Sequence, residues 1–106
     1  MAYHLPAMSV LDTRVHTVQT PDVVAVMEQW IEEEPQRCHF IVATGMHGVM
    51  EGKRDESFRA VLNAADLLVP DGFSLVWLAR RRGFPLRRRV TGTELMREFC
   101  RVSAQK

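Results

Sequence analysis

The feature that most constrains the fold is a short apolar run that stops at a Pro-Asp-Gly turn. Leu67 to Val69 are apolar, Pro70-Asp71-Gly72 follows, and a second apolar stretch with helical character begins at once. A short buried strand followed directly by a helix is typical of parallel α/β sheets, whose two faces are covered. Ligands of such sheets bind beyond the carboxyl ends of the strands. The sequence therefore predicts that Asp71 lies at a ligand-binding edge.

Two interpretations of Asp71 follow from its position. A carboxylate at this edge can accept a proton from a bound hydroxyl, which is general-base chemistry. Aspartate is also among the most frequent helix N-caps, where its oxygen accepts a hydrogen bond from a free backbone N–H of the first turn. From Val69-Pro70-Asp71-Gly72 alone, the N-cap is the simpler interpretation.

The rest of the chain repeats this alternation of strand and helix signals. We expect a strand or hairpin over 9–18, a buried parallel strand over 38–43 and a further strand over 67–69. We expect an amphipathic helix over 21–34 with Thr20 as its N-cap, and helical pieces over 49–53 and 56–65. A helix over 73–82 should end at Gly83 and Pro85, and a last helix should begin at the capping box Thr91–Glu94. This order predicts an α/β fold with a Rossmann-like parallel sheet and flanking helices. Only two or three strands are visible, so we expect residues 1–106 to form one incomplete domain, the N-terminal half of a larger unit.

Several side chains receive structural assignments from the same patterns. We expect three groups of apolar residues to be buried: Phe58, Val61 and Leu62; Leu95, Met96, Phe99 and Val102; and the two tryptophans, Trp30 and Trp77. Cys38 and Cys100 are far apart and are expected to be reduced thiols in the core. Asn63 and Asp66 are expected to order the helix end and the turn before the strand that follows.

Composition is ordinary for a globular domain, but charge is not evenly spread. The chain is 46% hydrophobic with a net charge of +1, and no apolar run approaches the length of a membrane span. The start lacks a signal-peptide layout, so we expect a cytoplasmic protein. Residues 1–53 hold three basic and seven acidic side chains, whereas residues 54–106 hold eleven and six. The triplets Arg80–Arg82 and Arg87–Arg89 favour an anionic partner, or are solvated cations near a helix end.

Four ordered motifs together resemble the WecG/TagA/CpsF family of bacterial glycosyltransferases, from about Ser9 to the end of the chain. They are Ala43-Thr44-Gly45-Met46-His47-Gly48-Val49-Met50-Glu51, then Arg59 to Asn63, Asp66 to Gly72, and Arg89-Val90-Thr91-Gly92-Thr93-Glu94-Leu95-Met96. The resemblance implies transfer of N-acetylmannosamine from UDP to an undecaprenyl-diphosphate-linked sugar in cell-surface polysaccharide synthesis. It covers the first half of the family. The second half supplies much of the nucleotide site and a membrane-contacting tail.

The resemblance also implies roles for individual residues. Asp71 is the general base, Arg89 stabilises the departing diphosphate, and the amides at Thr91 and Gly92 add anion contacts, although a pure capping role suits Thr91 better. Thr44 and His47 face the sugar from the first loop. Many members carry T-P-N-x-E in that loop, so the His47 variant leaves the identity of the sugar open. Burial would raise the pKa of Asp71 and the following helix N-terminus would lower it, so its value is open as well.

The expected partners are a UDP-sugar donor and a lipid-linked sugar acceptor. No cofactor and no metal are expected, because no acids and histidines have metal-ligand spacing. Peripheral contact at the inner face of the plasma membrane and a homo-oligomer are left open, and nucleic acid is not expected. The alternative is a non-catalytic α/β module that binds an anionic membrane or a nucleic acid through Arg80–Arg89.

Overall fold

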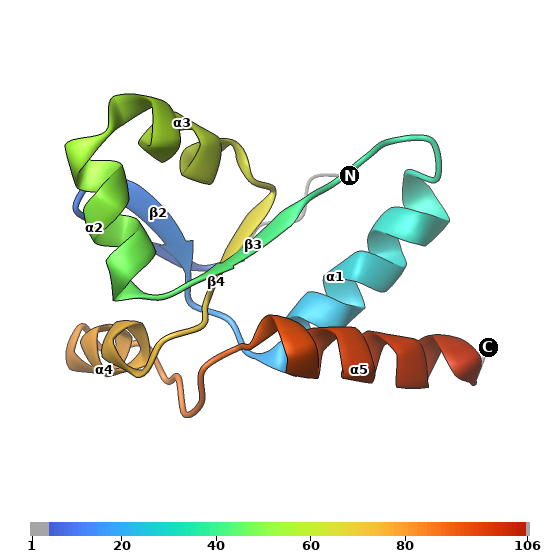
Figure 1. Ribbon diagram of the computed structural model, residues 1–106. Helices are drawn as coiled ribbons and strands as arrows, with labels where there is room; N and C mark the ends of the chain where they lie inside the picture. The colour runs from blue at the N-terminus through green and yellow to red at the C-terminus, as the bar shows by residue number, and fades with distance from the viewer. Residues whose placement is uncertain (1–4, 106) are drawn as a thin grey trace.

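The computed structural model describes residues 5–105, which form four strands and five helices (Figure 1). In chain order they are β1 (Ala7–Val10), β2 (Thr13–His16), α1 (Thr20–Glu33), β3 (Ile41–Thr44), α2 (Met46–Arg54), α3 (Glu56–Ala64), β4 (Leu67–Pro70), α4 (Phe73–Arg81) and α5 (Gly92–Ala104). The predicted strand and helix order is confirmed, with the first segment resolved into a hairpin. Gly83, whose φ is +95°, ends α4 in the left-handed region, as predicted.

The strands pair in two separate two-stranded sheets. β3 and β4 are parallel, with Ile41 opposite Leu67 and Thr44 opposite Pro70. Helices α2 and α3 connect them, so the predicted α/β class with an incomplete parallel sheet is confirmed. β1 and β2 form an antiparallel hairpin beside β4. A side chain bridges the hairpin to β4, because the backbone N–H of Leu68 donates to Nδ1 of buried His16 at 3.1 Å.

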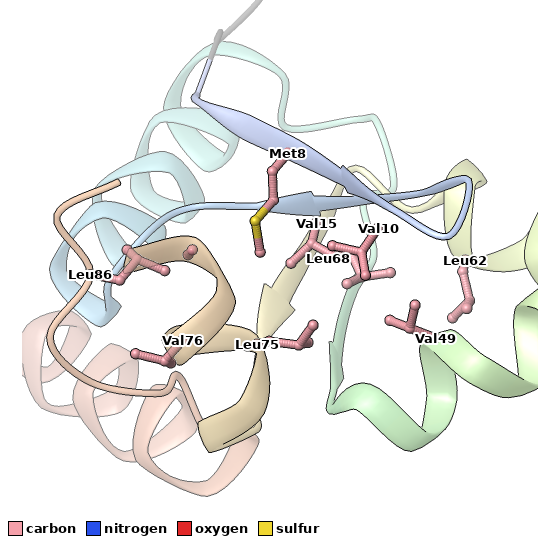
Figure 2. Close-up of a cluster of buried hydrophobic side chains, with 10 residues drawn as sticks. Met8, Val10, Val15, Val49, Leu62, Leu68, Leu75, Val76 and Leu86 are labelled. Carbon is pink, nitrogen blue, oxygen red and sulfur yellow. The ribbon is translucent and has the colours of Figure 1, made fainter. Parts of the chain in front are cut away.

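Strand β4 separates two hydrophobic cores. All four of its residues are buried, and their side chains alternate between the two sides, as a period of two requires. Leu68 joins the first core, shared with β1, β2, α2, α3 and α4 (Figure 2). Leu67 and Val69 join the second core, shared with α1 and α5. Full burial of one such side chain contributes about 1.5–3 kcal/mol, so β4 anchors both layers.

Strand β3 does not match its prediction as a buried strand. It starts at Ile41, not at Cys38, and its residues are half-buried, with Ala43 exposed. The physical reason is its place in the sheet, since β3 pairs with β4 on one edge only among the described residues. An apolar run predicts a strand but does not tell whether both of its edges are paired.

Other burial predictions fail for a related reason, because several helices are covered on one face only. Leu62 is buried, but Phe58 and Val61 are exposed; Leu95 is buried and Phe99 and Val102 are half-buried, but Met96 is exposed. Trp30 is half-buried and Trp77 is exposed, so neither lies in the core. Cys38 and Cys100 are free thiols as expected, but both are exposed and neither is a core residue.

The two predicted N-caps had different outcomes. Thr91 caps α5 as predicted, because its Oγ1 accepts from the backbone N–H of Glu94 at 3.1 Å. Thr20 does not cap α1. It is buried inside the first turn, and Gln19 is the N-cap, with its backbone N–H donating to Oδ2 of Asp22 at 3.0 Å. The cap therefore lies one residue earlier than the Thr-Pro-Asp signal suggests.

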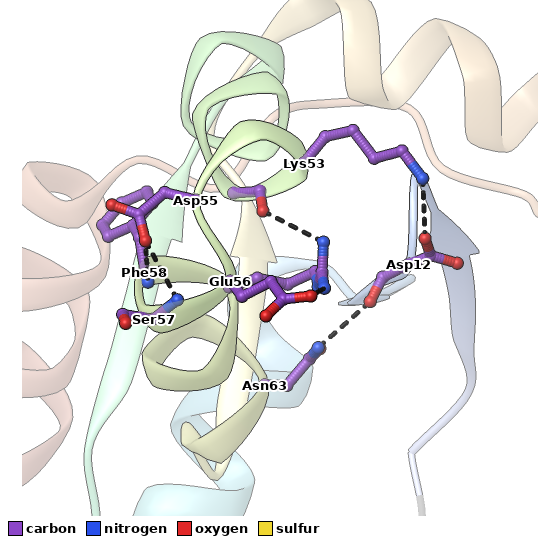
Figure 3. A network of polar contacts seen from close by, with 9 residues as sticks. Asp12, Lys53, Asp55, Glu56, Ser57, Phe58 and Asn63 are labelled. Atoms are coloured by element: carbon purple, nitrogen blue, oxygen red, sulfur yellow. Dashed lines mark hydrogen bonds and ion pairs between the residues drawn. The ribbon is translucent and has the colours of Figure 1, made fainter.

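A polar network fastens the hairpin to α2 and α3 (Figure 3). Leu11 and Asp12 form its turn with φ values of 49° and 69°, the backbone of a type I′ hairpin. Nζ of Lys53 lies 2.9 Å from Oδ2 of Asp12, and this hydrogen bond lowers the pKa of Asp12. Asn63 accepts from the backbone N–H of Arg14 at 2.8 Å and donates to the Asp12 carbonyl at 3.0 Å. Asn63 thus holds the hairpin and does not cap its own helix.

Candidate active site at the carboxyl ends of β3 and β4

Three helices begin at the carboxyl ends of the parallel strands, where Figure 1 shows the starts of α2, α4 and α5. Gly45 is the N-cap of α2 and Gly72 is the N-cap of α4, and neither cap provides a side-chain hydrogen bond. The α5 start is joined to β4, because Val90 donates its N–H to the Pro70 carbonyl at 2.7 Å. Free N–H groups at helix starts make this edge electropositive.

Asp71 lies in the turn between β4 and α4. Its backbone N–H donates to the Thr44 carbonyl at 2.9 Å, which extends the pairing of the two strands by one residue. The residue is half-buried, and its carboxylate has no hydrogen-bond or ion-pair partner within residues 5–105. Asp71 is therefore not the N-cap of α4, so the structural interpretation of this residue is wrong. Its carboxylate is held at the strand ends without a protein partner.

The glycines on either side of this turn allow the two strand ends to approach closely. A Cβ added to Gly72 would lie 2.9 Å from the Cα of Gly45, which is too close for any side chain. A Cβ added to Gly48 would collide with Oγ1 of Thr44. That hydroxyl donates to the Gly45 carbonyl at 3.3 Å. Thr44 is thus packed against the first turn of α2, and its backbone is bonded to Asp71.

A cavity of about 650 Å³ opens beside the start of α5. It is lined by Phe73, Arg88, Arg89, Thr91, Thr93, Glu94 and Arg97. Asp71 is not one of these residues, but it precedes Phe73 by two positions and is adjacent in sequence to Pro70, the partner of Val90. The structure therefore brings Arg89 and Thr91 together in one cavity, and it places Asp71 in the turn that leads to Phe73 in the cavity wall.

The guanidiniums of this cavity are not equivalent. Arg88 forms an exposed ion pair with Glu94 at 3.5 Å. Arg89 and Arg97 have no hydrogen-bond or ion-pair partner in the part of the chain that the structure describes. Two unpaired guanidiniums suit an anion with several oxygens, because each presents paired donors to phosphate.

The loop that carries these arginines is fixed by Gln19 at the start of α1. Oε1 of Gln19 accepts from the backbone N–H groups of Arg87 and Arg88, both at 3.0 Å. Its Nε2 donates to the Arg88 carbonyl at 2.7 Å. A single amide therefore holds two consecutive peptide groups just before Arg89, and this positions the cationic wall of the cavity.

His47 and Gly92 lie apart from these contacts. The predicted loop at 44–48 is in fact the first turn of α2 from Met46 onward, and His47 is exposed on it. His47 lines a separate cavity of about 360 Å³ with Gly48, Glu51, Asp55 and Phe58. Gly92 is the exposed first residue of α5. The structure therefore does not bring His47 to the cavity of Arg89.

The sequence motifs did not point to two residues of this cavity, Phe73 and Arg97. Arg97 lies four positions after Thr93 on α5, so both lie on one helix face, and this spacing was available from the sequence. Phe73 follows the Pro-Asp-Gly turn directly and was assigned only as the start of a helix. Its side chain is 76% exposed, a large exposed fraction for a phenylalanine at a helix start.

A second polar cluster lies at the opposite, amino ends of the two strands. The imidazole of His39 stacks on Trp30 with ring centroids 4.1 Å apart. Its two nitrogens lie 3.0 Å from Oε2 of Glu34 and 3.3 Å from Oδ1 of Asp66. Asp66 also accepts from the backbone N–H of Phe40 at 3.0 Å, so its predicted role in ordering the turn is confirmed. Each nitrogen of His39 thus has a carboxylate close by, although neither nitrogen makes a hydrogen bond of good geometry.

The six arginines of the two triplets do not form one surface. Arg81 lies over the ring of Trp77 at 5.8 Å, and Arg82 donates to the Ser9 carbonyl at 2.6 Å. Arg80 and Arg87 line a third cavity of about 440 Å³. Arg88 and Arg89 line the cavity beside α5. The six arginines are therefore close together in the sequence but do not form one cluster in the structure.

The described residues contain no group of three or more His, Cys, Asp and Glu side chains that could hold a metal ion. Within residues 5–105, every helix is too short or too polar to cross a membrane.

The parallel strand pair and its flanking helices define an α/β protein, and a free carboxylate and an arginine-lined cavity lie at the edge where ligands of such sheets bind. Residues 8–106 match the model of the glycosyl transferase WecG/TagA/CpsF family, and the chain belongs to this family. This confirms the resemblance and its predicted extent. The chain is also similar to the N-acetylglucosaminyldiphosphoundecaprenol N-acetyl-beta-D-mannosaminyltransferase of Bacillus spizizenii, with 31% identity over 67 residues, or 63% of this chain. The match spans 26% of that relative's length.

Proposed function

We propose that this chain is part of a glycosyltransferase that moves an N-acetylmannosamine-like sugar from a UDP-sugar to a polyprenyl-diphosphate-linked acceptor. The family membership supports the reaction class, and the Bacillus relative is named for an acceptor and a donor group of this kind. The process served is cell-surface polysaccharide synthesis. The proposal treats residues 1–106 as part of one larger glycosyltransferase domain.

One observation carries the proposal. The carboxylate of Asp71 has no protein partner among the described residues, although Asp71 lies at the carboxyl edge of the sheet, two residues before Phe73 in the wall of the cavity that holds two unpaired guanidiniums. A structural aspartate at a helix start is normally used as a cap, and this one is not. A free base next to an anion site is the arrangement that sugar transfer from a nucleotide requires.

In the proposed reaction Asp71 accepts the proton of the acceptor hydroxyl. The hydroxyl oxygen forms a bond to the anomeric carbon of the donor sugar, and the bond from that carbon to the diphosphate oxygen breaks. UDP leaves with the electron pair, and the anomeric carbon inverts. Arg89 and the free N–H groups of Gly92 and Thr93, which precede the first intrahelical hydrogen bond of α5, balance the charge of the leaving diphosphate.

Thr44 and His47 have supporting roles in the proposal. Thr44 accepts the Asp71 N–H through its carbonyl, so it orients the base through the backbone. His47 lines a separate cavity on α2, so the proposed contact of His47 with the sugar has no support from the geometry. A polyprenyl-linked acceptor is held in a membrane, so the proposal includes peripheral contact at its inner face.

The test measures UDP release from UDP-N-acetylmannosamine with and without a polyprenyl-diphosphate-linked N-acetylglucosamine acceptor. We expect release that requires the acceptor, is lost in Asp71→Ala, and is accompanied by donor binding that Asp71→Ala leaves intact. Arg89→Gln should weaken donor binding. Unchanged turnover in Asp71→Ala, or donor binding that does not depend on Arg89, would remove these residues from the mechanism.

The alternative of a non-catalytic module receives less support, because the arginines of the two triplets are distributed over four environments. The same preparation tests it. Retention on duplex DNA or on anionic vesicles that falls steeply with salt, without donor binding, would favour that function.

A further inference from the structure

Arg89 lies on a short exposed segment, residues 87–89, which we call the arginine segment. It runs between two buried anchors, because Leu86 belongs to the first core and Val90 to the second. All three of its residues are exposed, and none lies in a helix or strand. A segment of this kind samples several backbone conformations unless other groups hold its peptide units.

The amide of Gln19 holds the arginine segment. Within residues 5–105, no other group makes a hydrogen bond to the backbone of this segment. The bond from Nε2 of Gln19 to the Arg88 carbonyl, 2.7 Å long, fixes the peptide unit that joins Arg88 to Arg89. The next unit is fixed by the Val90 N–H, which donates to the Pro70 carbonyl at 2.7 Å. Both peptide units beside the Cα of Arg89 are therefore held, one from the start of α1 and one from the end of β4.

Gln19 is itself held in place. Its neighbours Val18 and Thr20 are buried, so its backbone has a fixed position at the start of α1. Its backbone N–H donates to Oδ2 of Asp22 at 3.0 Å, and its Nε2 also donates to the Val18 carbonyl at 3.1 Å. A side chain that is already ordered can hold a second segment with little further loss of conformational entropy.

The backbone of Arg89 is fixed by the protein, whereas its guanidinium is left for a ligand. This guanidinium has no hydrogen-bond or ion-pair partner in the described part of the chain. An arginine that binds a diphosphate loses conformational freedom on binding, and this loss weakens the affinity. The loss is smaller when the backbone already has the conformation of the complex. The hydrogen bonds of Gln19 should therefore increase the affinity of Arg89 for phosphate oxygens.

We propose that Gln19 is a positioning residue, which holds the backbone of Arg89 in the conformation that binds a diphosphate. The inference rests on the proposed function, in which Arg89 binds the leaving diphosphate. It adds a residue that does not line the cavity itself. Gln19 contributes to diphosphate binding only through Arg89, so its substitution should have no effect once Arg89 has been replaced.

The experiment is a double-mutant cycle on the full chain, with inorganic pyrophosphate as the probe and isothermal titration calorimetry as the measurement. We expect Gln19→Asn to weaken pyrophosphate binding about five- to tenfold, because its amide is one methylene too short to hold the arginine segment. In the Arg89→Gln background the same substitution should change the affinity by less than about twofold. A general loss of structure would instead weaken binding in both backgrounds.

Two features of the design separate positioning from stability. Asparagine is among the best helix N-caps, so Gln19→Asn leaves the start of α1 capped. Asp22→Ala is the matched control, because it removes the acceptor of the Gln19 backbone N–H but leaves the amide bonds to the arginine segment in place. Its free energy of unfolding should decrease, whereas its affinity for pyrophosphate should not.

Three results overturn the proposal. They are an unchanged affinity in Gln19→Asn, an equal loss from Gln19→Asn with and without Arg89, and a loss in Asp22→Ala as large as the loss in Gln19→Asn. In each case a weaker affinity of Arg89→Gln would still support the proposed function. Pyrophosphate binding that does not respond to Arg89→Gln would contradict the role of Arg89 in the proposed function, and the positioning role of Gln19 would fail with it.

Discussion

The two ends of the β3–β4 pair use polar residues in opposite ways. At the amino ends, His39 stacks on Trp30 and has a carboxylate partner beside each nitrogen, Glu34 at 3.0 Å and Asp66 at 3.3 Å. At the carboxyl ends, Asp71, Arg89 and Arg97 have no such partner within residues 5–105. Both ends hold ionisable groups close to the same strands, and they differ in whether the protein places a polar partner beside those groups.

This difference separates residues that stabilise the fold from residues that are available to a ligand. A polar group with a protein partner contributes its interaction to folding. A polar group without one contributes little to stability, and its interaction is left for a ligand. On this basis Asp66 and Asp71, two aspartates that flank the same strand, should respond to mutation in opposite ways.

The largest expected effect is on catalysis at the carboxyl end. Asp71→Ala should lower the rate of sugar transfer by a factor of about 10²–10⁴, because a general base contributes on that scale. Its free energy of unfolding should change by less than about 0.5 kcal/mol, since the carboxylate has no protein partner among the described residues. Acceptor-dependent UDP release and urea denaturation measure the two quantities. A large loss of stability would show that Asp71 is structural, like Asp66.

The next effect concerns the backbone that brings the strand ends together. Gly72→Ala should lower the free energy of unfolding by about 1–3 kcal/mol. The new Cβ would lie too close to the backbone of Gly45, and neither backbone segment can move away without distorting its strand end. Gly92→Ala is the matched control. A Cβ at Gly92 has no neighbour within 4 Å, so this variant should be neutral or slightly more stable. Equal effects at the two glycines would mean that the close approach is not a constraint.

At the amino end, Asp66→Ala should lower the free energy of unfolding by about 1–2 kcal/mol. It removes the acceptor of the Phe40 N–H and one of the two carboxylates beside His39. Thermal denaturation monitored by circular dichroism provides the measurement, with Asp71→Ala as the control of equal charge change. Transfer activity per folded molecule should remain close to that of the parent chain. If Asp66→Ala lost activity without losing stability, the contrast between the two ends would be reversed.

The smallest effect lies between the two ends, at His16. Burial lowers the pKa of His16, and the nearby Arg14 lowers it further, from an ordinary value of 6.5. Below about pH 6.5 the unfolded chain therefore takes up a proton that the folded chain resists, and the free energy of unfolding decreases. Above that pH the free energy of unfolding should not change with pH through His16. Urea titrations between about pH 5.5 and 7.5 detect the slope, and His16→Asn, which keeps an acceptor for Leu68, should lose it. The same slope in both proteins would contradict the assignment.

Much of the fold was predictable because it depends on local signals. The Pro-Asp-Gly turn, the Thr91 cap and the Gly83 stop each act through neighbouring residues, and all three lie where the sequence indicated. The wrong predictions concern burial, which depends on contacts between segments that are distant in the sequence. The apolar spacing of Phe58, Trp77 and Met96 predicted burial, but no element of the described chain packs on those faces.

The site was only partly predictable for the same reason. Motif order predicted roles for Asp71 and Arg89, and the structure puts them next to Pro70 and Val90, which are joined by a hydrogen bond. It could not place His47, whose loop turned out to be the first turn of α2. Arg97 and Phe73 were missed, because they acquire a role only through the cavity that they share.

The amide of Gln19 has a consequence for how this family member could diversify. Gln19 makes three hydrogen bonds to the backbone of the loop before Arg89, although it is distant from this loop in the sequence. These bonds fix the position of the loop. Replacing Gln19 would allow the loop before Arg89 to adopt another position and would change the width of the cavity that Arg89 lines. The shape of this cavity therefore depends on a residue that is not part of its lining.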